Sequence, residues 1–196
     1  MKKLVALMLT LTLALGVTAC GGAGNSSSGN GGAAKDDTEG KKAVDILTDV
    51  WAVYEEDEKF ALMGGDYENM VSDAPGTVNV ADGETLDGLL GYPADKAELL
   101  DDGASMMHMM NQNTFTAAAY HVADAGNVAD VAEALKENIM NRQWMCGFPD
   151  DLVVYSVGTN YVVVAFGAEE VVDSFEGHLE EVYASAENLY DEDLTF

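Results

Sequence analysis

Apolar side chains recur at helical spacing in three segments of the chain. Residues 43–60 and 168–184 each carry such a stripe, and residues 127–142 carry the clearest one. Asn127 precedes the first apolar residue of the clearest stripe. Asn is a preferred N-cap residue of helices, and Asp130 would lie in the first turn. The pattern therefore predicts three main helices.

Extended segments are predicted between these helices. Residues 152–157 and 161–166 are rich in β-branched and aromatic side chains, and the Gly-Thr-Asn between them suits a hairpin turn. Residues 115–122 alternate as a strand does. The methionine-rich residues 105–110 are interpreted as the preceding strand, joined to it through an Asn-Gln-Asn turn.

The remaining segments show no such pattern. Residues 61–83 are rich in Gly, Asp and Asn and predict a long, mostly irregular connection, and the acidic end of the chain is predicted to be loose. Strands joined by short hairpins must be antiparallel. The expected fold class is α+β, an antiparallel sheet of about four strands in ββαββα order with helices packed on it, preceded by an N-terminal helix. That first helix could cover the second face of the sheet, or that face could be a binding surface.

Residues 1–19 have the pattern of an export signal. Two lysines precede an apolar run over residues 4–17, which is shorter than the roughly 20 residues of a membrane-spanning helix. The end of the segment, Val17-Thr18-Ala19-Cys20, resembles the lipobox of bacterial lipoproteins. This resemblance implies cleavage before Cys20 and covalent lipid on that cysteine. The alternative is an ordinary cleaved signal followed by a chance cysteine.

The region after the signal divides into two parts. Residues 20–42 contain Cys20 and a stretch rich in Gly, Ser and Asn without apolar spacing, which predicts a flexible tether. Residues 43–196 are enough for a single acidic domain with its own core. We therefore expect a lipid-anchored, extracytoplasmic domain at the outer face of the cell membrane.

The charge narrows the choice of partners. The chain has 35 Asp and Glu against 9 Lys and Arg, for a net charge of −26. Nucleic-acid binding depends on phosphate neutralisation by Lys and Arg, so we expect no nucleic-acid partner. The same charge disfavours docking of the domain on anionic lipid, so contact with the membrane is expected through the lipid anchor alone. The acidity indicates a solvated surface, cation binding or a basic partner.

Acidic runs and the second cysteine are each open to two interpretations. The acidic runs could bind Ca²⁺, but they lack the alternating ligands and glycine of an EF-hand loop, so solvated surface is the simpler interpretation. Cys146 has no disulfide partner if Cys20 carries lipid, and is interpreted as a small buried hydrophobe, with a dimer-forming or reactive thiol as the alternative. The acidic runs are 55–58, 101–102, 150–151, 169–170 and 191–193.

The least usual segment is residues 106–110, Met-Met-His-Met-Met. In a strand, Met106, His108 and Met110 would share one face. Thioether and imidazole groups suit Cu(I), so these three residues are a candidate soft-metal site. Methionine is also a common filler of cores, so a methionine-rich strand packed against helices is the alternative.

Other candidate chemistry is sparse. Trp144 and Phe148 crowd the loop before residue 152 and are a possible partner-binding loop, because Trp is enriched at binding hot spots; packing under the core is the alternative. The sequence has no HExxH, Gly-x-Ser-x-Gly or phosphate-loop motif. We therefore assign no catalytic residue and expect no cofactor. An enzyme remains a less favoured possibility, since catalytic residues need not form linear motifs.

Residues 85–183 resemble an uncharacterised lipoprotein domain family, a domain of unknown function, of clostridial-type Gram-positive bacteria. The resemblance rests on the Met106-Met107 pair before a strand, the strand TAAAYHV, the helix VADVAEALKENI and the Gly-x-Asn-Tyr-Val hairpin at 158–162. The lipobox fits the same family, whereas the Met and His content of residues 106–110 departs from it. The resemblance implies a fold and a cellular address but no activity.

These observations lead to one functional hypothesis and one alternative. The chain is predicted to be a membrane-anchored lipoprotein that acts as a non-catalytic binding or interaction module for an unknown envelope protein or ligand. The alternative is soft-metal, copper binding through residues 106–110.

Overall fold

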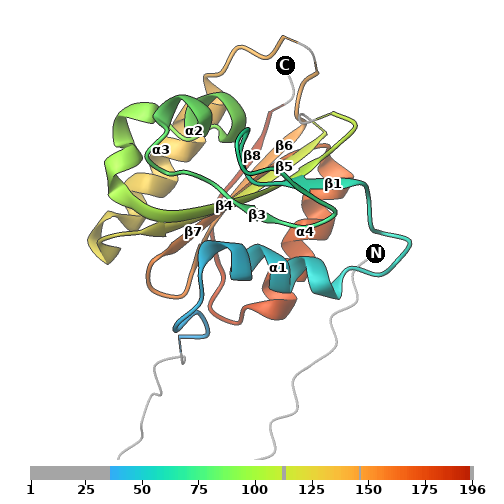
Figure 1. The fold of residues 1–196 in the computed structure, drawn as a ribbon, viewed down its shortest axis with the longest axis horizontal. Helices are drawn as coiled ribbons and strands as arrows, with labels where there is room; N and C mark the ends of the chain where they lie inside the picture. Colours follow the sequence, from blue (N-terminus) through green and yellow to red (C-terminus); the bar gives the residue numbers. More distant parts are fainter. Residues whose placement is uncertain (1–35, 112–113, 146, 195–196) are drawn as a thin grey trace, which may run out of the picture. The chain divides into compact units, whose positions relative to one another are not determined.

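The computed structural model describes residues 36–111, 114–145 and 147–194. The predicted signal, the predicted lipidation site Cys20, most of the predicted tether and Cys146 lie outside these ranges. The described residues belong to the compact unit Ala33–Phe196 and form α-helices, short 3-10 helices and one eight-stranded sheet (Figure 1).

Every strand pair of this sheet is antiparallel. The strands lie in the order β2-β1-β4-β5-β7-β6-β8, and β3 pairs with β4 beside this path. Their bounds are β1 Leu62–Gly64, β2 Val71–Ser72, β3 Gly76–Thr77, β4 Leu100–His108, β5 Phe115–Val122, β6 Asp151–Val157, β7 Tyr161–Gly167 and β8 Glu187–Asp193.

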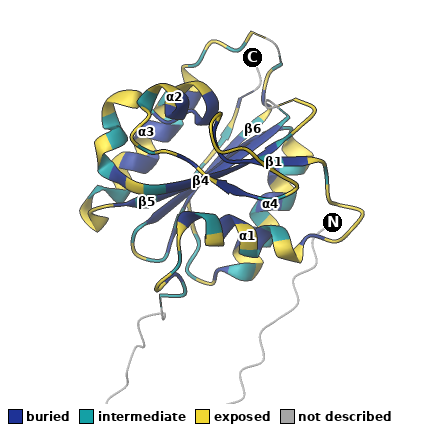
Figure 2. Cartoon of the chain, in the orientation of Figure 1, coloured by how far each residue is buried: buried dark blue, intermediate teal, exposed yellow. Residues whose placement is uncertain are grey.

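Helices cover both faces of the sheet (Figures 1 and 2). Helices α1 (Ala43–Val53) and α4 (Glu169–Val182) pack on one face, and α2 (Gly83–Leu90) and α3 (Val128–Met140) pack on the other. The short helices η1 (Ala94–Leu99) and η2 (Ala125–Asn127) precede β4 and α3. Strand β7 is buried along its whole length because helices cover both of its faces. Such a strand needs apolar side chains at successive positions, as the sequence of β7 has.

Each face has its own hydrophobic core. Ile46 of α1 and Phe175 of α4 meet sheet residues such as Ala117 and Val163 in one cluster. Leu86 of α2 and Leu135 of α3 meet side chains from the opposite face of the sheet in the other cluster. Among the described residues, the members of both clusters lie between residues 43 and 194, and helices pack on each face of the sheet. The second face of the sheet is therefore not a free binding surface.

The prediction of a sheet of about four strands in ββαββα order is wrong. The structure has eight strands, because β1, β2 and β3 arise in the connection expected to be irregular and β8 arises in the acidic end expected to be loose. The first three are only two or three residues long, too short to show a period of two. Strand β8 is an exposed, acidic edge strand, so it also lacks an apolar pattern.

Other elements agree with the pattern of the sequence. The helix predicted at 127–142 is α3, and the hairpin predicted at 152–166 is β6 and β7. The helix predicted at 43–60 ends at Val53, where Tyr54 has an extended backbone.

The strand register defines two ends of the sheet. At one end, here called the His108 end, Leu62 pairs with His108, and Phe115, Gly167, Asp151 and Asp193 pair in turn. The register between β4 and β5 runs up to Met107 and Thr116, the neighbours of His108 and Phe115 in the chain. At the opposite end Tyr161 pairs with Val157, and the described part of the tether docks there. Tyr161 donates a hydrogen bond to the Lys41 carbonyl at 2.6 Å, and Thr159 donates to Asp36 at 2.6 Å. The chain thus enters the domain at the end of the sheet remote from His108.

Candidate functional site

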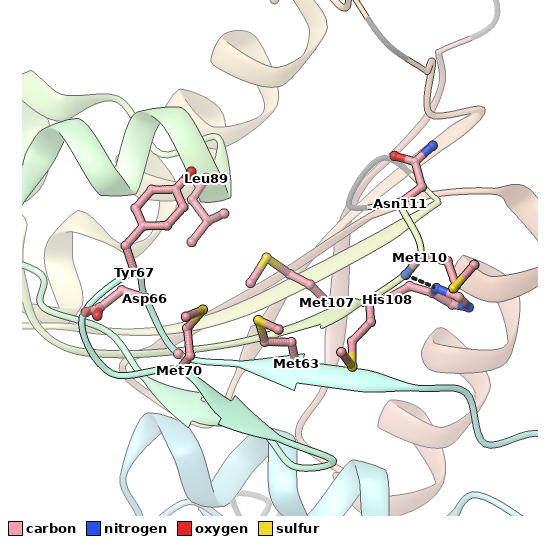
Figure 3. A pocket seen from close by; sticks show the side chains of 11 residues that line it. Met63, Asp66, Tyr67, Met70, Leu89, Met107, His108, Met110 and Asn111 are labelled. Carbon is pink, nitrogen blue, oxygen red and sulfur yellow. Dashed lines mark hydrogen bonds between the residues drawn. The ribbon is translucent and has the colours of Figure 1, made fainter.

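A hollow of about 310 Å³ opens at the His108 end, between the loop after β1, helix α2 and the turn after β4 (Figure 3). We call it the methionine hollow. Five of the eight methionines in the described part of the chain line it. The lining includes Met63, Met70, Met107, Met109 and Met110 together with Tyr67, Leu89 and His108.

The rim of the methionine hollow exposes large apolar side chains to solvent. Met70 is 61% exposed, Met110 82% and Tyr67 64%. Methionine is unbranched and polarisable, so its side chain adapts to different apolar partners. A contiguous group of exposed apolar side chains is typical of an interaction surface, whereas isolated ones are not.

Asp66 holds the loop that carries this rim. Its buried carboxylate accepts hydrogen bonds from the backbone N–H groups of Asn79 at 2.7 Å, Asn69 at 2.8 Å and Glu68 at 3.0 Å. Burial raises the pKa of Asp66, but these hydrogen bonds outweigh burial and leave the pKa below its ordinary value. An ionised Asp66 therefore shapes the segment from which Tyr67 and Met70 project.

Close backbone packing supports the same loop. A Cβ on Gly64 would lie 2.2 Å from the backbone nitrogen of Gly76, so β1 and the chain before β3 meet only because both residues lack side chains. Gly65 adopts a positive φ of 87°, which glycine tolerates best. Its carbonyl accepts a buried hydrogen bond of 2.7 Å from Ser105 of β4.

The predicted soft-metal residues Met106, His108 and Met110 do not all reach this hollow. Met106 is fully buried in the core under α1 and α4, whereas Met107 belongs to the core on the other face, as strand alternation predicts. Strand β4 ends at His108, so Met110 lies in the following turn. There its backbone N–H donates to His108 Nδ1 at 3.2 Å, and the His108 ring stacks on Phe60 at 4.8 Å. His108 and Met110 are therefore neighbours, and Met106 is not among the residues that line the hollow.

The proposed partner-binding loop separates its two aromatic residues. Trp144 is half-buried against the α2–α3 core, with its ring centroid 5.6 Å from that of Phe166 and with Arg142 over its face. Phe148 is 62% exposed. Of the two, Trp144 has the packing expected of a core residue, and Phe148 is presented to solvent.

A second hollow of about 320 Å³ is lined by carboxylates. It lies on the α4 side of the sheet, where β6 begins and β8 ends. We call it the carboxylate hollow. Its lining is Asp150, Asp151, Glu169, Asp173, Asp191 and Asp193. Three of the acidic runs thus meet here, at the start of β6, the start of α4 and the end of β8.

The carboxylates of this hollow repel one another. Burial, and to a smaller extent the negative charges of Asp191 and Asp173, raise the pKa of Asp151 above its ordinary value. Across the described ranges, no group of three or more His, Cys, Asp or Glu side chains is arranged to hold a metal ion. The carboxylate hollow is therefore a concentration of negative charge without the geometry of a metal centre.

Comparison of the chain with protein-family models, with curated proteins and with solved structures finds no match. The resemblance to a lipoprotein domain family stays a prediction. In the part of the chain that the structure describes, no helix has the length and apolar character needed to cross a bilayer.

Sequence reasoning identified part of the methionine hollow and missed the rest. The run at residues 106–110 supplies Met107, Met109 and Met110. Met63 and Met70 come from the segment expected to be irregular, and no periodic signal marks them. Only the pairing of β1 with β4, which places Met63 opposite Met107, brings the two groups together.

Proposed function

We propose that this chain is a non-catalytic binding module, held at the outer face of the cell membrane by lipid on Cys20, and that the methionine hollow binds apolar side chains of an envelope protein. The observation that carries the proposal is the gathering of exposed apolar residues around one hollow. Tyr67, Met70, Met109 and Met110 belong to the large apolar residues most exposed in the described chain.

The size and lining of the methionine hollow suit this role. Its volume lies at the small end of the range for ligand pockets, which favours one or two side chains over a large cofactor. Flexible methionines can repack around different partners, as in other adaptable binding surfaces. Asp66 is engaged by the loop's own backbone, so its carboxylate serves the shape of the hollow.

The test uses Nile red, a neutral apolar dye, and the unlipidated chain 20–196 with Cys20→Ser. The dye should bind with enhanced fluorescence, and the double variant M70S/M110S should weaken binding at least fivefold. The matched control is M140S/M145S, which removes two exposed methionines elsewhere. Absence of dye binding, or equal loss in both double variants, would contradict the proposal.

A second candidate function, capture of Cu(I), is favoured by the thioether content of the same hollow. Met63 and Met107 are registered partners on β1 and β4, and Met70, Met109 and Met110 line the same space. Thioethers are soft ligands that select Cu(I) over Zn²⁺ or Ca²⁺. This ligand set differs from the predicted Met106, His108 and Met110 because the turn after His108 ends the alternation.

Thermal unfolding with Cu(I) under reducing conditions distinguishes the two functions. A ligand that binds only the folded chain raises its melting temperature. Capture of copper predicts a rise that is lost in M63L/M107L, a volume-conserving change that removes two sulfur atoms. No rise with Cu(I) removes this candidate and leaves the binding module.

A further inference from the structure

The methionines around the methionine hollow differ sharply in their access to solvent. Met70, Met109 and Met110, here called the rim methionines, are 61%, 49% and 82% exposed and all line the hollow (Figure 3). Met107 lines the same hollow but is only 7% exposed, and Met106 is fully buried in the core on the other face of the sheet. A small molecule dissolved in the surrounding water therefore reaches the rim methionines far more readily than the buried ones.

The thioether of methionine has one characteristic reaction in water, which is oxidation to the sulfoxide. With a hydroperoxide, a lone pair of the sulfur forms a bond to the outer peroxide oxygen and the O–O bond breaks. The proton of the transferred oxygen passes to the departing oxygen, so hydrogen peroxide leaves as water. The sulfur loses two electrons and the peroxide gains them. Methionine sulfoxide reductases reverse the change, with two thiols converted to a disulfide and the oxygen released as water.

A sulfoxide changes the character of the side chain at the rim. It replaces a flexible apolar group with a polar one that carries a strong hydrogen-bond acceptor. Burying such a group against an apolar partner is unfavourable unless it finds a donor. The hollow relies on apolar contact through Tyr67, Leu89 and the methionines, so oxidation of its rim removes much of the surface that an apolar partner would cover.

The fold around the hollow does not depend on the rim sulfurs. The loop that carries Met70 is held by hydrogen bonds from backbone N–H groups to Asp66 and by the bond from Ser105 to the Gly65 carbonyl. Met106 and Met107, which belong to the two cores, are shielded from solvent. Oxidation of the exposed sulfurs therefore alters the binding surface and leaves the packing beneath it in place.

We propose that Met70, Met109 and Met110 are a redox modification site, and that hydroperoxides convert the methionine hollow from an apolar to a polar surface by oxidising them to sulfoxides. The inference rests on the proposed function, since it concerns the apolar binding that takes place there. It adds a means of regulation. The reduced chain binds its apolar partner, the oxidised chain releases it, and reduction of the sulfoxides restores binding.

The experiment treats the unlipidated chain 20–196 with hydrogen peroxide. Cys20→Ser and Cys146→Ser remove both thiols, so that methionine is the remaining sulfur. Peptide mapping by mass spectrometry should show sulfoxide at the rim methionines forming at least tenfold faster than at Met106 and Met107. Nile red affinity should fall at least fivefold while the urea midpoint stays unchanged. Methionine sulfoxide reductases for both sulfur epimers, with dithiothreitol, should restore the affinity.

Two leucine variants test which methionines are responsible. M70L/M109L/M110L removes the rim sulfurs, and the matched control M140L/M145L removes two exposed methionines that do not line the hollow. Leucine is close to methionine in volume and cannot take up oxygen. The quantity compared is the ratio of Nile red affinities before and after peroxide, whatever the starting affinity of the variant. This ratio should stay below twofold in M70L/M109L/M110L and exceed fivefold in the control.

The outcomes separate this inference from the proposed function. An equal loss of affinity after peroxide in the two leucine variants would assign the effect to other residues and overturn the inference. A urea midpoint that falls together with the affinity would mean damage to the fold, which also overturns it. If sulfoxide forms at the rim without loss of affinity, while M70S/M110S still weakens Nile red, the redox site is wrong and the binding module stands. Failure of the untreated chain to bind Nile red would remove the proposed function and this inference with it.

Discussion

At the scale of single residues, Asp66 shows how a charged group can be structural within a binding surface. Its carboxylate is almost fully buried and accepts four hydrogen bonds from Glu68, Asn69 and Asn79. A sequence search for catalytic or metal-binding acids would have no means of recognising it, because three of its four donors are backbone N–H groups and the fourth is the side-chain amide of Asn69.

The substitution D66N is predicted to destabilise the domain by about 1–3 kcal/mol at pH 7, because an amide offers one acceptor oxygen where the carboxylate uses two. The folded pKa of Asp66 is lowered, so its contribution is present above the ordinary value of 3.8 and is lost as pH falls through the folded pKa. Urea unfolding at pH 7 and pH 3 measures this. A destabilisation of equal size at both pH values would contradict the role of the ionised carboxylate.

A second prediction at this scale concerns Gly64. G64A places a Cβ 2.2 Å from backbone atoms of Gly76, which cannot move aside as a flexible side chain can. We expect a loss of about 1–3 kcal/mol or more and weaker Nile red binding, since the loop bearing Met70 is displaced. The control is G88A in α2, where a Cβ meets nothing within 4 Å; it should stabilise the domain by up to about 1 kcal/mol. Equal effects of the two changes on urea unfolding would refute the packing argument.

At the scale of elements, long periodic segments could be predicted from the sequence and short ones could not. Helix α3 and the β6–β7 hairpin follow from repeated apolar spacing and turn chemistry. Strands β1 to β3 have two or three residues each, and their pairing with one another and with β4 depends on tertiary contacts at Gly64 and Gly76. The methionine hollow combines both kinds of element, so only the part on β4 and its turn had a sequence signal.

The segment 36–42 behaves as part of the domain. Hydrogen bonds from Thr159 and Thr38 lower the pKa of Asp36 to about 2, Asp37 contacts Ser185, and Lys41 forms an ion pair with Asp49 at 2.6 Å. A chain that begins at Ala43 should therefore be less stable than one that begins at Ala33 by about 2–4 kcal/mol, from several hydrogen bonds of about 1 kcal/mol each. Identical urea midpoints for the two chains would show that these contacts contribute nothing.

At the scale of the whole molecule, helices on both faces of the sheet bury many tyrosines. Burial is the main cause that raises the pKa of Tyr161 to about 12, and it also raises the pKa values of Tyr54, Tyr92, Tyr120, Tyr155 and Tyr183. A raised pKa in the folded state means that the stability contribution is complete below the ordinary value of 10 and is lost as pH rises above it. Urea midpoints should hold steady up to about pH 9.5 and fall steeply by pH 11. A flat profile to pH 11.5 would contradict the burial of these hydroxyl groups.

Residues 36–42 and the two hollows lie at opposite ends of the sheet. Residues 36–42 dock at the end of the sheet beside Tyr161, whereas the methionine and carboxylate hollows lie at the His108 end. Along β4, from Asp102 to His108, six steps of about 3.3 Å separate the two ends by about 20 Å. Lipid on Cys20 would therefore hold the chain by the end remote from the proposed binding surface.

The central claim is that the methionine hollow is the binding surface, and methyl NMR of the unlipidated chain 20–196 tests it most directly. Each methionine methyl group gives its own signal, so bound Nile red can be located without changing the hollow. The account predicts shifts for Met63, Met70, Met107, Met109 and Met110, which line the hollow, and none for the buried Met106 or for Met140 on α3. Shifts confined to Met140 and Met145, or no shift at saturating Nile red, would contradict it.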